Sequence, residues 1–360
     1  MLLIFKEVFL FNFEMEIDYL IGSKETFLNF LDSIGLYDKV AILTHNDLDG
    51  LASGLFLEKI LEAKGIKVNY IDFLDIKSDM VKEASLKLNE EGINKVFFAD
   101  IGVDDIDFEG FEDLRREKNV LLIDHHPIGE NVKDFTNIIK AASGDCIALV
   151  TFVLGEGLID YELWGWLVSS AIFADYAFRS EKNMRFLQSF YPDVTVENLS
   201  STVPGMNARK ISSALIYYKN DIKYVYNLVK ERNIDELTEI HELIEDEVYK
   251  LVDDFSINKK YFPKNDIYFY EVHSNFDVLS YLTTLVAGAE PEKNFIFMYK
   301  TKGIVKFSAR SSSAKIDMGK LLKKGVQDLE GADGGGHIRA AGAKVPEEYV
   351  ETFKKRVLEE

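Results

Sequence analysis

The stretch Leu121-Leu122-Ile123-Asp124-His125-His126-Pro127 decides the fold and marks a candidate site. The apolar run Val120–Ile123 predicts a buried strand, and Pro127 prevents its regular continuation. An aspartate and two adjacent histidines directly after a buried strand are poorly suited to a core. Imidazole and carboxylate together suit Mn²⁺, Zn²⁺ or Fe²⁺. The sequence therefore favours a metal site at this strand end.

Two earlier predicted strands also end in acids. If the segment 45–50 stays extended, His45, Asp47 and Asp49 point to one face. Asp100 follows another buried apolar strand, where a charge is costly unless it is paired or bound to a metal. The alternatives are structural: Asp47 and Asp49 as acids at the start of the next helix, and Asp100 as a cap of the following loop.

Short strands alternate with helices from residue 39 to residue 123, which indicates βαβ units and a parallel sheet. Functional residues collect at the carboxyl ends of such strands. A first helix is predicted over Ile17–Leu36, a long connecting helix over Asp235–Phe255, and a second α/β pattern from Asp266. The predicted fold class is α/β, with a parallel-sheet domain over 1–180, a helical segment and connector over 181–262 and a smaller α/β domain over 263–360.

The amino-acid composition of the chain excludes several classes of protein. A formal net charge of −19 argues against a broad basic surface for long duplex DNA. The single cysteine, Cys146, excludes intramolecular disulfides and CxxC zinc sites and makes the cytoplasm the expected compartment. No stretch reaches the roughly 18 uncharged residues of a membrane span. We expect the apolar segment Met1–Phe13 to be a docking strand or helix, or the product of a start codon assigned too far upstream, rather than a signal peptide.

Later segments supply further candidates. Asp175 follows an apolar run and is either a metal ligand or a helix-end acid paired with Arg179. The run Gly334-Gly335-Gly336-His337, with Arg339 nearby, can present backbone N–H groups in a concave nest for anions, or it is a flexible loop. Arg310 ends a predicted strand and is either a bidentate phosphate ligand or a solvated charge.

These motifs resemble those of the DHH phosphoesterases, named for the sequence seen here as Asp124-His125-His126. HNDLDG (45–50), ADIG (99–102), DHHP (124–127) and the acid of FADYA (173–177) look like the four metal motifs of that family, in order. Residues 307–310 and the GGGH run look like its DHH-associated C-terminal domain. The resemblance covers about 39–175 and 266–345. Several relatives have an acid where this chain has His45, and residues 179–262 match nothing.

The resemblance implies two divalent ions, commonly Mn²⁺ with Mg²⁺ or Co²⁺ as alternatives, in a cleft between the domains. By analogy, one ion would be held by His45, Asp47 and Asp100. The other would be held by Asp49, Asp100, His125 and Asp175, so that Asp100 bridges. Asp124 would orient a ligand histidine, and His126 would face the substrate. The expected substrate-binding residues are Arg310, Gly334, Gly335, Gly336, His337 and Arg339.

The expected reaction is hydrolysis of a phosphodiester by a two-metal mechanism. The length of the chain and its negative net charge favour single-stranded RNA or DNA, or short oligonucleotides, as substrates. They would be digested from an end, as RecJ-type exonucleases and oligoribonucleases do. The alternatives are a phosphodiesterase for cyclic dinucleotides or pAp, and a non-catalytic replication or repair scaffold. An active enzyme can also dock on a replication complex. Asp49→Ala is expected to abolish turnover with the fold largely intact, and Arg310→Ala to raise KM.

Overall fold

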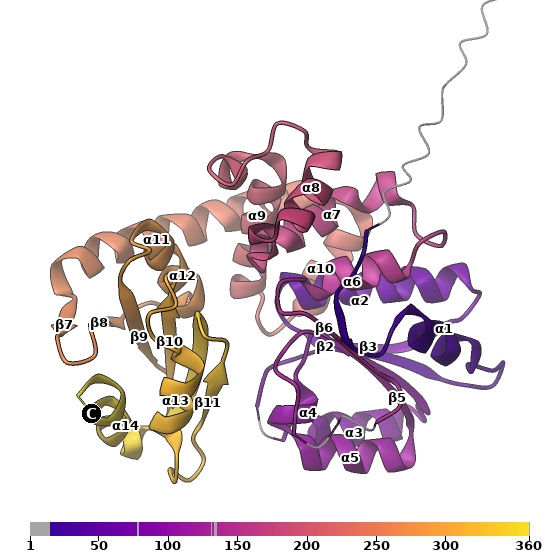
Figure 1. The fold of residues 1–360 in the computed structure, drawn as a ribbon, viewed down its shortest axis with the longest axis horizontal. Coiled ribbons are helices and arrows are strands. Elements are labelled where there is room, and N and C mark those ends of the chain that lie inside the picture. Colours follow the sequence, from indigo (N-terminus) through magenta and orange to yellow (C-terminus); the bar gives the residue numbers. More distant parts are fainter. Residues whose placement is uncertain (1–14, 78, 131, 133–134, 360) are drawn as a thin grey trace, which may run out of the picture.

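A computed structural model describes residues 15–77, 79–130, 132 and 135–359 and shows two α/β domains joined by helices (Figure 1). The apolar segment Met1–Phe13, for which a docking role is expected, lies outside the described residues. Within the described part of the chain, no helix combines the length and apolar character needed to cross a membrane.

The first sheet has six strands in the order β1-β6-β5-β4-β2-β3. Strands β2 to β6 run parallel, and β1 pairs antiparallel with β6. The carboxyl ends of the parallel strands therefore meet at one edge. The strands are β1 Tyr19–Ile21, β2 Val40–His45, β3 Val68–Leu74, β4 Lys95–Ala99, β5 Asn119–Asp124 and β6 Ile138–Ala141.

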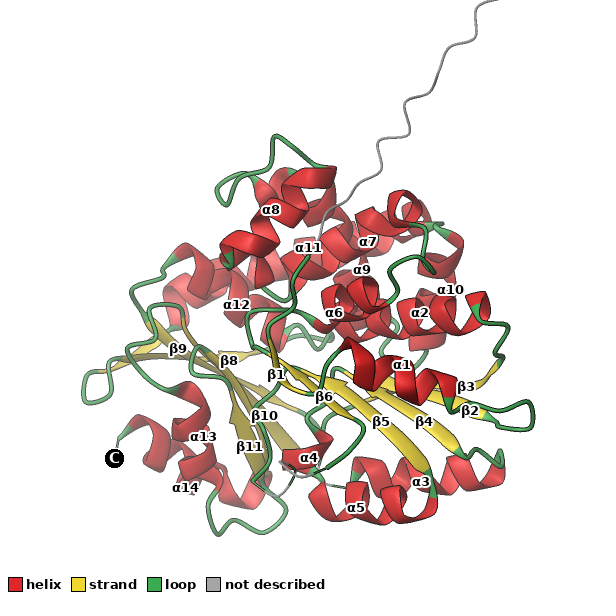
Figure 2. Ribbon diagram, turned by 45° about the vertical axis from the view of Figure 1, so that its right-hand side comes forward, coloured by secondary structure: helices red, strands yellow, loops and turns green. Residues whose placement is uncertain are grey.

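Helices cover both faces of this sheet (Figure 2). One core contains Ile42 and residues of α1, α2, α6 and α7, and the opposite core contains Leu43 and residues of α3 and α5. Burial on both sides explains why β2, β4 and β5 contain continuous apolar runs rather than alternating residues. The helices are α1 Lys24–Asp32, α2 Leu48–Ala63, α3 Met80–Glu90, α4 Val103–Ile106, α5 Phe108–Glu117, α6 Ile147–Leu154 and α7 Tyr161–Ala174.

A helical segment follows and leads into the second domain. It comprises η1 Ala177–Arg179, α8 Glu181–Phe190, η2 Leu199–Ser201, α9 Val203–Tyr217, α10 Ile222–Glu231, η3 Ile234–Leu237 and α11 Thr238–Asn258. The long helix α11 runs along the top of Figure 1 and joins the two domains. Its residues Ile244, Val248 and Phe255 pack into the core of the second domain. The connector is therefore part of that core and not a free linker.

The second sheet has the order β11-β12-β10-β9-β8-β7, and only β8 and β9 pair in parallel. Helix α12 covers one face, and α13 and α14 cover the other. The elements are β7 Lys260–Phe262, β8 Ile267–Val272, α12 Leu279–Ala289, β9 Asn294–Lys300, β10 Ile304–Ser311, α13 Met318–Val326, β11 Asp333–Gly336, β12 Ala340–Pro346, η4 Glu347–Tyr349 and α14 Val350–Leu358. Because β7 belongs to this sheet, we now propose that the C-terminal domain begins at residue 260 rather than 263.

The prediction of one helix over Ile17–Leu36 is wrong at its start. Tyr19–Ile21 forms β1 because it pairs with the open edge of β6, opposite Ala141. The helix itself begins at Lys24, where the Ser23 side chain accepts a hydrogen bond from the Thr26 N–H group. Edge pairing has overridden the helical pattern of these residues.

Candidate metal centre

The turn from β2 into α2 places the first candidates. His45 is the last residue of β2, Asp47 caps the helix by accepting a hydrogen bond from Gly50 N (2.9 Å), and Asp49 lies in the first turn. The structure therefore shows the alternative of acids at the start of a helix, and not an extended segment. A Cβ atom on Gly50 would lie 2.3 Å from the carbonyl oxygen of His45, so only glycine permits this close turn. His45 Nδ1 lies 2.9 Å from Asp47 Oδ2.

Asp49 is fixed by a second helix. Its two carboxylate oxygens accept hydrogen bonds from Ile147 N (2.8 Å) and Ala148 N (2.7 Å) at the start of α6. The positive end of that helix favours a carboxylate. Burial and the nearby carboxylates of Asp100 and Asp175 raise the pKa of Asp49 well above its ordinary value. Asp49 is thus held rigidly among like charges.

These bonds revise the expectation that Asp49→Ala leaves the fold intact. The substitution is expected to lower the free energy of unfolding by about 1–3 kcal/mol, because two buried N–H groups lose their acceptor. Urea unfolding followed by circular dichroism measures this. Asp113→Ala, at a side chain that is 75% exposed, is the control. An unchanged midpoint for Asp49→Ala would contradict this capping role.

Asp100 lies between two histidines. Its backbone has φ = +60°, which is uncommon for a residue other than glycine. Its Oδ1 lies 3.3 Å from His125 Nε2, and its Oδ2 lies 3.8 Å from His45 Nδ1. Burial opposes ionisation of Asp100, but the bonds and charges of His125 and His45 outweigh burial and lower its pKa. The carboxylate faces the site and accepts no backbone N–H group in the described residues, so it does not act as a loop cap.

His125 connects this group to Asp175. Its ring is almost fully buried, and its Nδ1 lies 3.7 Å from Asp175 Oδ2. Burial raises the pKa of Asp175 to about 7, the charge of His125 opposes that rise, and the charge of Asp100 adds to it. Asp175 is the C-cap of α7. Asp175 is thus an acid at a helix end, but among the described residues it forms no ion pair with Arg179, which the alternative required.

Four groups of ligand-type side chains lie together in the described residues, and two of them consist only of predicted ligands and share Asp100. The ligand-type atoms of His45, Asp47 and Asp100 lie within 4.8 Å of one another, and so do those of Asp49, Asp100 and His125. Asp100 Oδ2 and His125 Nδ1 are buried without a hydrogen-bond partner. Such atoms are uncommon in native structures. A divalent cation would satisfy both atoms and offset the crowded carboxylates, and oxygen and imidazole ligands fit Mn²⁺.

A buried charge network lies behind this cluster. Lys140 Nζ lies 2.7 Å from Asp124 Oδ2 and 2.7 Å from Asp104 Oδ1, and all three side chains are fully buried. Neither Lys140 nor Asp104 was predicted as a site residue. The available signal was a lysine inside the apolar run Ile138–Ala141, which a buried ion pair explains.

Asp124 orients His126. Its Oδ1 lies 2.7 Å from His126 Nδ1, and its Oδ2 accepts a hydrogen bond from His126 N at 3.0 Å. The histidine that Asp124 contacts is therefore His126, and not the candidate ligand His125. Burial opposes ionisation of Asp124, but the charges of His126 and Lys140 lower its pKa well below its usual range. Because a carboxylate only accepts, the proton between the two side chains belongs to Nδ1 of His126.

The C-terminal domain reaches this cluster through His337. The rings of His126 and His337 stack with centroids 5.4 Å apart. Gly334–Gly336 lie in the extended edge strand β11, so the predictions of a concave nest and of a flexible loop are both wrong in form. The turn 337–340 is held by the start of α13, where Gly319 N donates to the carbonyl of His337. Burial and the charge of His126 lower the pKa of His337 to about 4.

Arg310 is held by neutral groups. Its guanidinium donates to Thr284 Oγ1 (2.9 Å), Ser280 Oγ (2.8 Å) and the Ala309 carbonyl (2.9 Å), and it has no carboxylate partner in the described chain. Burial lowers its pKa to about 10. Ser308, two residues earlier on the same face of β10, has a buried hydroxyl without a partner and was not predicted as a site residue. The charge of Arg310 is thus not neutralised by a carboxylate of the described residues.

Known proteins match both domains. A model described as "DHH family, N-terminal domain" matches residues 39–163, and one described as "DHHA1 domain" matches residues 271–360. Together they span more than half of the chain. The chain belongs to the DHH family. A curated relative, an uncharacterized protein of Methanocaldococcus jannaschii, is 34% identical over 94 residues, which cover 25% of this chain and 20% of that protein.

Solved structures share the fold of this DHH-family chain. RecJ in complex with Mn²⁺ from Thermus thermophilus gives a TM-score of 0.68 at 17% identity, over 93% of this chain and 53% of that one. Exonuclease RecJ bound to manganese gives 0.66 at 18% identity, over 93% of each chain. CDC45 from Entamoeba histolytica gives 0.58 at 12% identity, over 93% and 97%. The chain spans about half of the first structure, and these identities show the fold alone.

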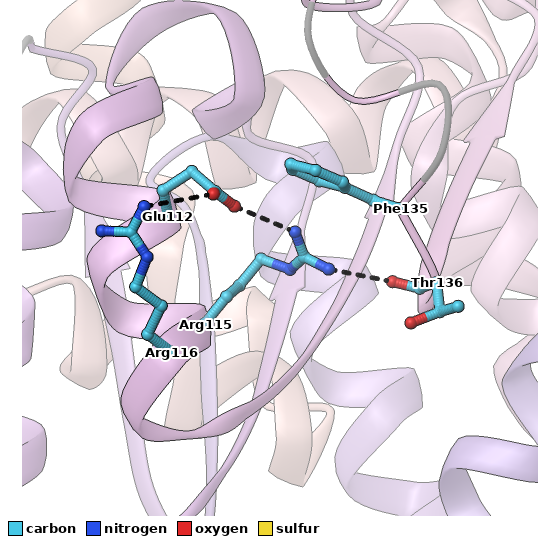
Figure 3. Close-up of a pocket in the computed structure, with 5 residues that line it drawn as sticks. All are labelled: Glu112, Arg115, Arg116, Phe135 and Thr136. Carbon is cyan, nitrogen blue, oxygen red and sulfur yellow. Dashed lines mark hydrogen bonds and ion pairs between the residues drawn. The ribbon is translucent and has the colours of Figure 1, made fainter.

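Figure 3 shows a separate hollow in this DHH-family chain. It is lined by Glu112, Arg115, Arg116, Phe135 and Thr136. Arg115 donates to Glu112 (3.1 Å) and to the Thr136 carbonyl (3.4 Å) and covers the Phe135 ring. The hollow sits where β5 and β6 begin, at the opposite edge from the candidate ligands. Its polar groups are already partnered, and we assign it no role.

Proposed function

We propose that this protein is a divalent-metal-dependent phosphodiesterase that hydrolyses single-stranded nucleic acid or short oligonucleotides from an end. The observation that carries the proposal is the pair of ligand groups joined at Asp100, with a histidine of the second domain stacked beside them. The RecJ structures give support because they share this fold, contain manganese or magnesium, and include one named as an exonuclease.

In this proposal, the candidate ligands hold two metal ions. His45, Asp47 and Asp100 would hold one, and Asp49, Asp100, His125 and Asp175 would hold the other. We favour Mn²⁺, with Mg²⁺ and Co²⁺ as alternatives. When bound, such ions lower the pKa of water and stabilise the charge that develops at a reacting phosphate.

The residues of the chain supply position and selectivity. Asp124 and Lys140 fix the His126 ring, which is then placed to bond a substrate oxygen through Nε2. Arg310 uses one N–H bond on each of its nitrogens within the protein, so each terminal nitrogen retains one donor. Guanidinium donors suit a phosphate. His337 closes the site from the other domain.

The proposal is tested by digestion of single-stranded RNA and DNA of increasing length, labelled at either end, with Mn²⁺. Cyclic dinucleotides and pAp are assayed in parallel, and Asp100→Asn is the inactive control. End-directed cleavage of strands supports the proposal. Turnover confined to cyclic dinucleotides or pAp would replace it with a signalling or recycling phosphodiesterase. No turnover with any divalent ion would favour a replication or repair scaffold.

Arg310→Ala is expected to raise KM for an oligonucleotide by about 10–100-fold with a smaller change in kcat. A charged hydrogen bond of about 1.5–3 kcal/mol to a substrate phosphate is lost. Steady-state kinetics with a labelled pentanucleotide measure both constants. Arg116→Ala, at a side chain that is 71% exposed, is the matched control. A KM equal to that of the wild type would remove Arg310 from the substrate site.

A further inference from the structure

We propose that Tyr217, Tyr218, Tyr224 and Phe276 form an aromatic platform that holds the part of a single-stranded substrate remote from the scissile bond. Tyr217 and Tyr224 would stack on bases of the strand, and Tyr218 and Phe276 would hold these two rings in place. This inference rests on the proposed function and adds to it a second point of contact, which only strands of several nucleotides would reach.

The turn between α9 and α10 gathers three of these rings. Tyr217 is the last residue of α9, Tyr218 is its C-cap, and Tyr224 lies in the first turn of α10. A hydrogen bond from Asp221 N to the Tyr218 carbonyl (2.7 Å) closes the turn. The Tyr218 ring lies 4.9 Å from that of Tyr217 and 4.8 Å from that of Tyr224. The three rings therefore form one continuous cluster.

The second domain adds the fourth ring. Phe276, in the loop between β8 and α12, lies 6.0 Å from the ring of Tyr217. Tyr218 and Phe276 are half-buried, whereas Tyr217 is 42% exposed and Tyr224 is 40% exposed. The two inner rings thus hold the two outer ones, whose remaining surface is open to a ligand. Side chains that are already fixed lose little conformational freedom when a ligand binds.

The platform continues from the candidate site along strand β10. Arg310, Ser308 and Lys306 alternate along β10 and therefore share one face of the sheet. Lys306 Nζ lies 2.5 Å from Asp277 Oδ2, and Phe276 directly precedes Asp277. The segment of β10 from Arg310 to Lys306 is about 14 Å long. A strand that is bound at Arg310 and runs along β10 would reach the platform only with its later nucleotides.

The first domain approaches the same place. Strand β3 ends at Leu74, opposite the candidate ligand His45. The next residue, Asp75, pairs with Lys344 of β12 (3.2 Å), and Lys344 is the register partner of Lys306. The platform is therefore connected to the metal centre through both domains.

A single strand of nucleic acid is the ligand that fits this surface. Proteins hold single strands by stacking bases on aromatic rings beside basic residues. Lys219 is exposed in the same turn and forms no ion pair among the described residues, and the acid of that turn, Asp221, caps α10. Exposed tyrosines also suit a protein partner, but the continuity with the candidate site favours the substrate strand.

The three tyrosines belong to this chain rather than to the shared domains. They lie between the matched ranges 39–163 and 271–360, in the helical segment. Membership of the DHH family therefore does not imply the platform.

The test compares a dinucleotide, a dodecanucleotide, and a dodecanucleotide that lacks its bases beyond the third nucleotide from the cleaved end. KM and kcat are measured with Mn²⁺, and binding is measured by fluorescence anisotropy in EDTA. Tyr217→Ala and Tyr224→Ala are each expected to raise KM and Kd for the normal dodecanucleotide about tenfold, the size of one base stack. Both values are expected to stay unchanged for the dinucleotide and the abasic strand. Lys219→Ala is expected to weaken both long strands alike.

Two further variants serve as controls. Tyr217→Phe keeps the ring and is expected to behave like the wild type, which separates stacking from loss of the hydroxyl group. Tyr37→Ala removes a tyrosine side chain that is 93% exposed in another part of the chain. It is expected to change no value.

The platform would be overturned by Tyr217→Ala and Tyr224→Ala variants that bind the normal dodecanucleotide like the wild type, or that weaken the dinucleotide and the abasic strand equally. The first result would leave the tyrosines for a protein partner. A wild type that cleaves the dinucleotide but binds the dodecanucleotide no more tightly would also overturn the platform, and the proposed function would stand. Tyrosine-dependent binding of strands without any cleavage would instead refute the proposed function and support the platform.

Discussion

Replacing Asp100 by asparagine is expected to lower kcat/KM by at least about a thousandfold, which corresponds to about 4 kcal/mol of lost transition-state stabilisation. Asp100 is the one residue common to both ligand groups, so neutralising it weakens both proposed ion sites together. Asparagine has nearly the same shape and tolerates the left-handed backbone at this position better than most residues. The fold is therefore expected to survive while the chemistry is lost.

Kinetics with the pentanucleotide, Mn²⁺ titration calorimetry and circular dichroism together measure this result. Asp105→Asn is the matched control, since it makes the same change at an exposed position of α4. Calorimetry is expected to show weaker Mn²⁺ binding in Asp100→Asn and unchanged binding in Asp105→Asn. Activity of Asp100→Asn within tenfold of the wild type would refute the bridging role.

Replacing Lys140 by methionine is expected to lower the free energy of unfolding at pH 7 by about 3–5 kcal/mol. Methionine fills most of the space but leaves Asp104 and Asp124 buried without their cation. Lys87→Met, in a surface pair on α3, is expected to leave stability nearly unchanged, because an exposed ion pair contributes little. The double variant Asp104→Asn with Lys140→Met is expected to recover part of the loss, because one buried charge is removed. Chemical denaturation measures all of these values.

The pH dependence of that loss follows from Asp124. Its pKa is lowered in the folded protein because His126 and Lys140 outweigh burial. A carboxyl group of this kind stabilises the fold above its unfolded pKa of about 3.9, and this contribution is lost as the pH falls through the folded value. Without Lys140, Asp124 takes up a proton more readily. The difference in stability between wild type and Lys140→Met is therefore expected to shrink from pH 7 towards pH 4. A difference that is constant over this range would argue against the charge network as its source.

The sequence predicted the strands that carry the site because they are short apolar runs bounded by polar turns. It placed Asp100 and Asp124 at strand ends for that reason, and the structure brings both to the same edge. The segment 45–50 was harder to predict, since Asp47 and Asp49 suit a strand end and a helix start equally well. The structure shows the helix start, and the same carboxylates still face the site.

Features that depend on distant partners could not be predicted. In the sequence, Lys140 is an unexplained charge inside an apolar run. The structure explains it, because Lys140 forms ion pairs with Asp104 and Asp124. The glycine run suggested a nest or a loop because glycine allows both. Its extended form depends on pairing with β12 and on the close approach of α13, where a Cβ on Gly319 would lie 2.3 Å from the carbonyl oxygen of Gly336.

The stacking of His126 on His337 joins residues that are far apart in the chain and belong to different domains. The two ligand groups that share Asp100 lie in the first domain, whereas His337 and Arg310 lie in the second. Under the proposed function, the first domain would carry the residues for hydrolysis and the second would carry those that contact the substrate, and α11 connects the two. We expect that replacing the second domain can redirect such an enzyme to another substrate, while the residues for hydrolysis in the first domain stay unchanged.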